Sequence, residues 1–130
     1  MVIRQVLPCI ALAIFMYSGA ALGQVTPFGQ DVNAAIEDGL NWLDNEGAFN
    51  NPSDAGRAAG LVALTLLDKP RSADQRALPQ GYADASPADQ QRINNVMAYI
   101  ISQANQSFYA YRDGSSLAAL TVYIRTGGPN

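Results

Sequence analysis

The densest group of polar and aromatic side chains in this sequence stands near its C-terminal end. It contains two tyrosines, an arginine and an aspartate: Tyr109, Tyr111, Arg112 and Asp113. Hydroxyl, guanidinium and carboxylate groups spaced so closely could bind a polar ligand, because loops on a rigid scaffold often carry binding sites. The same residues also suit a structural role, with Asp113 capping a helix and the tyrosines sealing the turn before it. We favour the structural role.

Two further aromatic residues, Trp42 and Tyr99, could line a cavity for a hydrophobic ligand. They occupy matching positions of an internal repeat described below. Aromatic residues at matched repeat positions more often pack in the core, and we favour that interpretation. Asp54 and Arg57 have the spacing of a surface ion pair on a helix. None of these residues is predicted to be catalytic.

The absence of histidine limits the chemistry that this chain can perform. The sequence has no histidine, and its one cysteine is Cys9. Histidine is the usual general base near neutral pH and the commonest metal ligand. If a leader that contains Cys9 is removed, neither a disulfide nor a thiolate metal site can form. We therefore expect no cofactor and no metal, and we favour a non-enzymatic role.

The charged residues are scattered along the chain. Eight basic and eleven acidic residues give a formal charge of −3 over 130 residues, and 48% of the residues are hydrophobic. This composition is typical of a single globular domain. A nucleic-acid-binding protein would need clustered lysines and arginines, so we expect no nucleic acid partner.

Residues 1–23 have the pattern of a secretory signal peptide. Arg4 provides the positive start, "VLPCIALAIFM" is the apolar centre, and Ala21 and Gly23 suit cleavage before Gln24. The alternative is an uncleaved helical anchor, which would be the chain's only membrane contact. We favour cleavage, because Pro8, Ser18 and the glycines weaken this apolar run as a membrane span. Export of a mature chain without disulfides fits a bacterial periplasm or the extracellular space better than a eukaryotic secretory route.

The rest of the chain is predicted to be all-α, with a lead-in over residues 24–30 and four main helices in a domain over residues 31–128. We expect the helices at about 31–45, 53–69, 86–104 and 115–126. The first and third are amphipathic. The second and fourth, with "AAGLVALTLL" and "LAALTVYI", are apolar on every side and need cover all round. A strand over "ALTVYIRT" is the alternative for the last, which we favour less.

Local residue types indicate where the helices begin. Ser53 is the expected N-cap of the second helix, and Ser86 followed by Pro87 is the expected start of the third. Gly39 lies inside the first helix, where a close approach of another helix would explain it. The connection after the second helix contains many turn-forming residues, with one helical turn expected over 73–78.

An internal repeat links the two halves of the domain. An offset of 56 residues matches Leu61, Ala63, Leu64 and Thr65 to Leu117, Ala119, Leu120 and Thr121. An offset of 57 matches Ile36, Trp42 and Leu43 to Ile93, Tyr99 and Ile100. The order amphipathic, apolar, amphipathic, apolar therefore indicates two consecutive helical hairpins. The apolar helices would form an inner layer and the amphipathic helices an outer one.

These segments resemble a known family of helical repeats. "AIEDGLNWLDNEGAF" followed by "AGLVALTLL", and "FYAYRDGSSLAALTVYIRTGG", are similar to the α/α-toroid repeats of the terpenoid cyclase and protein prenyltransferase superfamily, of the squalene–hopene cyclase type. Trp42 and Leu43 match the family's "WL" pair, and Gly47 and Phe49 stand where its glycine and aromatic residue would be. The resemblance implies a partial α/α toroid. It implies no active site, because the family's acidic cluster and zinc ligands have no counterparts.

Two hairpins cannot close a ring, and repeat stacks generally need about three units. We therefore expect an uncovered apolar face, and either further C-terminal repeats or a homo-oligomer that covers it. The predicted function is an exported, non-enzymatic helical-repeat module, the N-terminal part of a toroid-like protein. The alternative is a fragment of a cyclase-like or prenyltransferase-like enzyme whose catalytic residues lie outside this chain.

Overall fold

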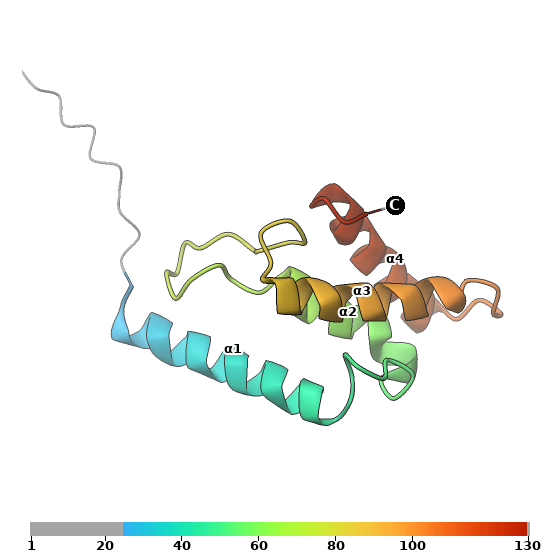
Figure 1. Cartoon of the computed structure of the whole chain (residues 1–130), viewed down its shortest axis with the longest axis horizontal. Coiled ribbons are helices and arrows are strands. Elements are labelled where there is room, and N and C mark those ends of the chain that lie inside the picture. Colours follow the sequence, from blue (N-terminus) through green and yellow to red (C-terminus); the bar gives the residue numbers. More distant parts are fainter. Residues whose placement is uncertain (1–24, 130) are drawn as a thin grey trace, which may run out of the picture.

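The fold is all-α, as predicted. A computed structural model describes residues 25–129, in which four α-helices follow one another (Figure 1). They are α1 (Pro27–Asn45), α2 (Ala59–Leu67), α3 (Pro87–Ser102) and α4 (Ala110–Arg125), with a 3-10 turn, η1 (Gly56–Ala58), before α2. Residues 119–126 belong to a helix or its end, so the strand alternative is wrong. The predicted leader lies outside the described residues. Among the helices that the structure describes, none is both long and apolar enough to span a membrane.

The short helix α2 lies at the centre of the fold. It packs most extensively against α4 and then against α3, whereas α1 touches it over a short stretch. Figure 1 shows α1 and α3 running in one direction and α2 and α4 running in the other. The largest fully buried side chains come from the loop before α2, from α2 and from α3: Phe49, Leu66, Leu67, Ile93, Val96 and Met97.

The first and third helices begin at residues that satisfy their free N–H groups. Ser86 Oγ accepts a hydrogen bond from the Asp89 N–H at 3.1 Å, and Pro87 is the first residue of α3, as predicted. Thr26 Oγ1 accepts one from the Gly29 N–H at 3.0 Å, with Pro27 opening α1. Part of the predicted lead-in is therefore helical, and α1 begins earlier than residue 31. Thr26 followed by Pro27 is the local sequence pattern that indicates this earlier start.

The predicted starts of α2 and α4 are wrong. Ser53 is no N-cap, because its hydroxyl donates to Asn51 Oδ1 and Gly56, with φ +52°, interrupts the chain before the helix. The fourth helix begins at Ala110 and not near Ser115. The expected helical turn over 73–78 is also absent from the structure, which has bends and turns there. Glycine and loop geometry thus override the local capping pattern.

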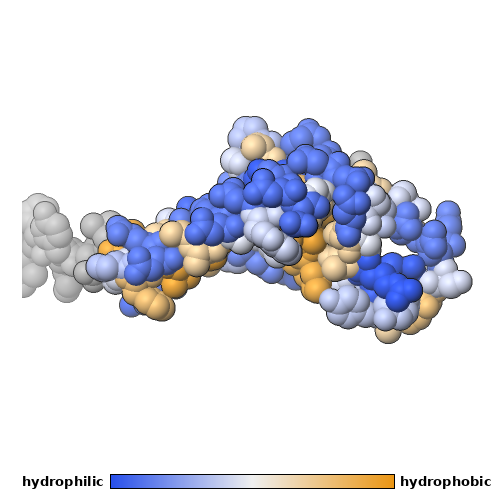
Figure 2. Space-filling view, turned by 90° about the horizontal axis from the view of Figure 1, so that it is seen from below, coloured by the Kyte–Doolittle hydropathy of each residue, from blue (hydrophilic) through white to orange (hydrophobic). Residues whose placement is uncertain are grey.

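The two apolar helices differ in how well they are covered. Most of α2 is buried, as predicted, but in α4 only Ala119 and Tyr123 are buried. Leu117 and Ile124 are 67% and 55% exposed, so the expected cover around α4 is missing in the described residues. Figure 2 shows apolar residues in a band across the middle of one face and beside the start of α1, set among hydrophilic residues. The predicted uncovered apolar face is therefore present.

A glycine does allow two helices to approach closely, but it is Gly60 and not Gly39. A Cβ at residue 60 would overlap with the backbone of Ser115 and Ser116 in α4. At Gly39 nothing lies within 4 Å of the place where a Cβ would stand. Gly60 and Ser116 are counterparts in the repeat, 56 residues apart. At the other end of the two helices, Leu67 and Val122 line one hollow, which agrees with a common direction.

Candidate functional site

An apolar groove of about 560 Å³ lies between the end of α3 and the first half of α4. Gly56 and Ala59 reach it from η1 and the start of α2. Phe108 and Leu117, which are 81% and 67% exposed, stand on its walls. The other lining residues are Tyr99, Ile100, Gln103, Ala104, Gln106, Arg112, Asp113, Gly114, Ser116 and Leu120. Grooves lined mainly by apolar side chains with a few polar groups are the usual form of a ligand site.

The charged residues of the groove are already paired with each other. Arg112 Nε donates to Asp113 Oδ1 at 2.7 Å, and a terminal Arg112 nitrogen donates to the Ser107 carbonyl at 2.6 Å. Asp113 Oδ2 accepts from the Tyr109 N–H at 2.6 Å, which caps the start of α4. The hydrogen bond from Arg112 and the one from the Tyr109 backbone lower the pKa of Asp113. The same ion pair raises the pKa of Arg112, so both groups stay charged around neutral pH.

The structure brings together only some of the residues that the sequence singled out. Tyr99, Arg112 and Asp113 line the groove. Tyr109 and Tyr111 lie outside its lining, and the guanidinium carbon of Arg57 stacks 4.5 Å from the Tyr109 ring centre. This stacking occupies Arg57, and Asp54 instead accepts a hydrogen bond from Asn51, so no Asp54–Arg57 ion pair forms.

Trp42 does not pack in the core. Its side chain is 61% exposed on α1, so the interpretation that we favoured is wrong for this residue. It does not line the groove beside Tyr99 either. Its repeat counterpart Tyr99 is half-buried. The two aromatic residues match in the sequence but differ in their surroundings, because α1 touches α2 only briefly whereas α3 packs along it.

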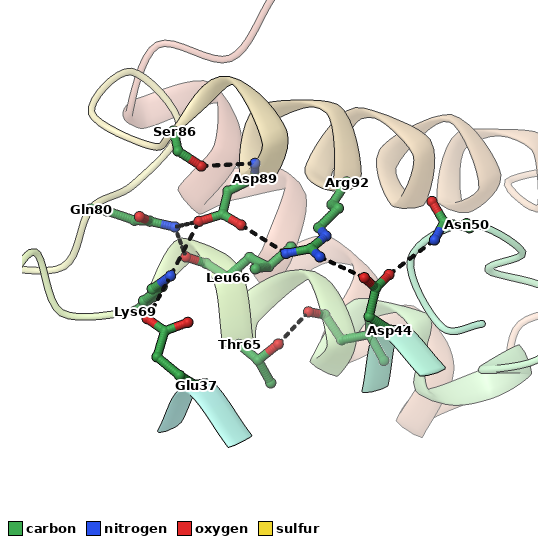
Figure 3. A network of polar contacts seen from close by, with 11 residues as sticks. Glu37, Asp44, Asn50, Thr65, Leu66, Lys69, Gln80, Ser86, Asp89 and Arg92 are labelled. Carbon is green, nitrogen blue, oxygen red and sulfur yellow. Dashed lines mark hydrogen bonds and ion pairs between the residues drawn. The ribbon is translucent and has the colours of Figure 1, made fainter. Parts of the chain in front are cut away.

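A second polar cluster, which the sequence did not reveal, joins α1, α3 and the segment after α2 (Figure 3). Asp89 at its centre is 4% exposed. Its carboxylate lies 3.4 Å from Lys69 Nζ and 3.3 Å from an Arg92 nitrogen, and Gln80 Nε2 donates to it at 3.5 Å. Asp89 stands four residues before Ile93, on the buried stripe of α3. This spacing is the feature of the sequence that could have indicated a buried carboxylate.

Lys69 and Arg92 also form ion pairs with acidic residues of α1. Lys69 Nζ lies 2.9 Å from Glu37 Oε1, and Arg92 lies 2.5 Å from Asp44 Oδ2. Burial lowers the pKa of Lys69, but hydrogen bonds and charges from Glu37 and Asp89 outweigh it and raise the pKa above the ordinary value. Lys69 therefore stays protonated, and every charge in the cluster has a partner. This arrangement connects α1, α3 and the segment after α2 through ion pairs.

Comparison of the chain with protein-family models, curated proteins and solved structures found no match. The resemblance to toroid repeats therefore remains a proposal. Within residues 25–129, no three acidic side chains are grouped in a way that could hold a metal ion.

Proposed function

We propose that this chain is an exported, non-enzymatic helical-repeat module of the α/α-toroid type, which binds an apolar partner in the groove between α3 and α4. One observation carries the proposal. The groove is walled by exposed apolar residues, and its charged lining residues, Arg112 and Asp113, neutralise each other. A site of this kind suits a partner that buries apolar surface there. Each Å² of apolar surface that is buried contributes about 25 cal/mol to the free energy of binding.

The packing of α2 against α4 supports the repeat part of the proposal. Gly60 and Ser116 are repeat counterparts, and they meet at a close approach of two helices that run in one direction. In stacked repeats each unit contacts its neighbours through equivalent elements. The amphipathic α1 and α3 run in the opposite direction, as the outer helices of hairpins would.

A dye whose fluorescence rises in apolar surroundings tests the binding role. Ala104 lines the groove and is exposed, so Ala104→Phe should fill part of the groove. Ala98, exposed on α3 outside the groove, provides the matched control Ala98→Phe. We expect Ala104→Phe to weaken dye binding about tenfold, a change of about 1.4 kcal/mol, and Ala98→Phe to leave it unchanged. Equal affinities for both variants would refute the groove as the binding site.

N-terminal sequencing of the protein recovered from an expressing bacterium tests export separately. A start at Gln24 in the exported fraction is the expected result. An intact Met1 in the membrane fraction would contradict export and support an anchored protein. The dye measurement does not depend on this outcome, because the groove lies entirely within residues 25–129.

A further inference from the structure

One face of α4 has the residue spacing of a helix–helix seam and lies open. Gly114, Leu117, Thr121 and Ile124 are all exposed and follow each other at intervals of three, four and three residues. This is the spacing of the apolar positions in a coiled coil. Nothing lies within 4 Å of the place where a Cβ of Gly114 would stand, so another backbone could approach there. In Figure 1, α4 lies at the edge of the fold.

The distribution of charge indicates which partner can approach this face. The chain has a formal charge of −3, so two copies repel each other over most of their surface. Its acidic residues are concentrated before residue 90, and the stretch from Ile93 to Asn130 contains only Asp113. Asp113 is neutralised by Arg112, which leaves Arg125 as the uncompensated charge on α4 among the ion pairs of the described residues. Self-association is therefore least opposed at α4.

The residues along one edge of the seam favour an antiparallel pair. Tyr111, Ala118 and Arg125 are exposed and stand seven residues apart on this edge. In an antiparallel pair the corresponding edges of two helices meet, so Ala118 would face its own copy. Arg125 would then lie beside Tyr111 of the second copy, where a cation–π contact can form. A parallel pair would instead place the two Arg125 side chains at the same level and align the helix dipoles.

We propose that α4 pairs with α4 of a second copy of this chain, in antiparallel orientation, through the seam Gly114–Leu117–Thr121–Ile124. The inference goes beyond the proposed binding role of the groove between α3 and α4, because it concerns the open face of α4. Gly114 and Leu117 belong to both the seam and the lining of the groove, so the second copy borders the groove. One helix pair buries less surface than the roughly 1,600 Å² of a standard interface, so the dimer should be weak and depend on concentration.

Sedimentation equilibrium of the full chain over a range of concentrations tests the pairing. We expect a monomer–dimer equilibrium with a dissociation constant in roughly the micromolar range. Leu117→Glu should raise that constant at least about tenfold, because it places a charge in the seam. Leu61, the repeat counterpart of Leu117, is an exposed leucine on the open side of α2. Leu61→Glu should leave the dissociation constant unchanged. Circular dichroism should show equal helix content in both variants.

Two further variants separate a lost interface from a lost fold. Gly114→Gln improves helix propensity and meets no neighbour, so it should keep the monomer folded while it weakens the dimer. In a Cys9→Ser background, Ala118→Cys should form an intermolecular disulfide on oxidation and Ile124→Cys should not. Crosslinking of Ile124→Cys alone would overturn the antiparallel orientation.

A monomer at every concentration would overturn the pairing altogether. If the dye still distinguished Ala104→Phe from Ala98→Phe in that case, the proposed binding role would stand without the dimer. If the dye failed to distinguish them while the chain still dimerised through α4, the groove would lose its role and the pairing would remain.

Discussion

Gly60 of α2 lies against the backbone of Ser115 in α4, with no room between them for a Cβ. This approach sets the distance between the two central helices. Gly60→Ala should therefore force them apart and destabilise the fold by about 1–3 kcal/mol, even though alanine is the better helix former. Urea unfolding followed by circular dichroism measures the change.

Gly39→Ala is the matched control for that substitution. Gly39 also lies inside a helix, but nothing occupies the space around its missing Cβ. The substitution should stabilise the chain by about 0.5–1 kcal/mol through helix propensity alone. If both variants were stabilised alike, the close contact between α2 and α4 would be wrong.

Removal of the buried carboxylate at the start of α3 should be costly. Asp89→Ala leaves Lys69 and Gln80 without their shared acceptor, and we expect a loss of about 3–5 kcal/mol in the free energy of unfolding. Glu37, the more exposed partner of Lys69, has a side chain that is 42% exposed. Glu37→Ala should therefore cost about 1 kcal/mol or less. Chemical denaturation of the two variants compares them. Equal losses would mean that Asp89 is not the centre of the cluster.

Trp42 reports directly on the surroundings of α1, because it is the chain's single tryptophan. With 61% of its side chain exposed, its emission should resemble that of a solvated indole, and acrylamide should quench it efficiently. The intensity should fall on addition of quencher with little difference between dilute and concentrated protein, because α1 lies outside the proposed seam. A blue-shifted, protected emission would show that another surface covers this helix.

The stability of α4 should depend on pH through Asp113. The pKa of this carboxyl is lowered by Arg112 and by the Tyr109 N–H, so its ionised form favours the folded state. Its contribution is complete above the ordinary pKa of about 3.9 and is lost as the pH falls through the lower folded value. The thermal midpoint of Asp113→Ala should therefore lie below that of the parent at neutral pH and converge with it in strong acid. A difference that stayed constant down to pH 2 would contradict this linkage.

The sequence predicted the helices best where a local signal decides the structure. Ser86 and Pro87 marked the start of α3 because capping and proline geometry act within one turn. The start of α4 was predicted too late because Tyr109 has no capping side chain, and Asp113 reaches back to its N–H instead. The apolar run of α2 correctly indicated burial, since a short helix of this composition must be enclosed.

Long-range neighbours could not be predicted from the same patterns. The repeat matched Trp42 to Tyr99, yet one is exposed on α1 and the other lies beside the groove, because α1 and α3 pack differently against α2. The groove itself depends on the angle between α3 and α4, which no local signal encodes. The contacts of Asp89 likewise need α1, α3 and the segment after α2 to meet. For the candidate site, the sequence therefore identified Tyr99, Arg112 and Asp113 without the surface that joins them.

The central claim is that α2 and α4, the repeated apolar helices, lie side by side in one direction. Spin labels on paired cysteines in a Cys9→Ser background, diluted with unlabelled chain, measure this most directly. Asp68→Cys with Ile124→Cys should give a short distance, because neighbouring helix axes lie about 8–10 Å apart. Asp68→Cys with Leu117→Cys should give a distance clearly longer, since seven residues of helix add about 10 Å along the axis. The reverse order, or two distances that are both long, would contradict the account.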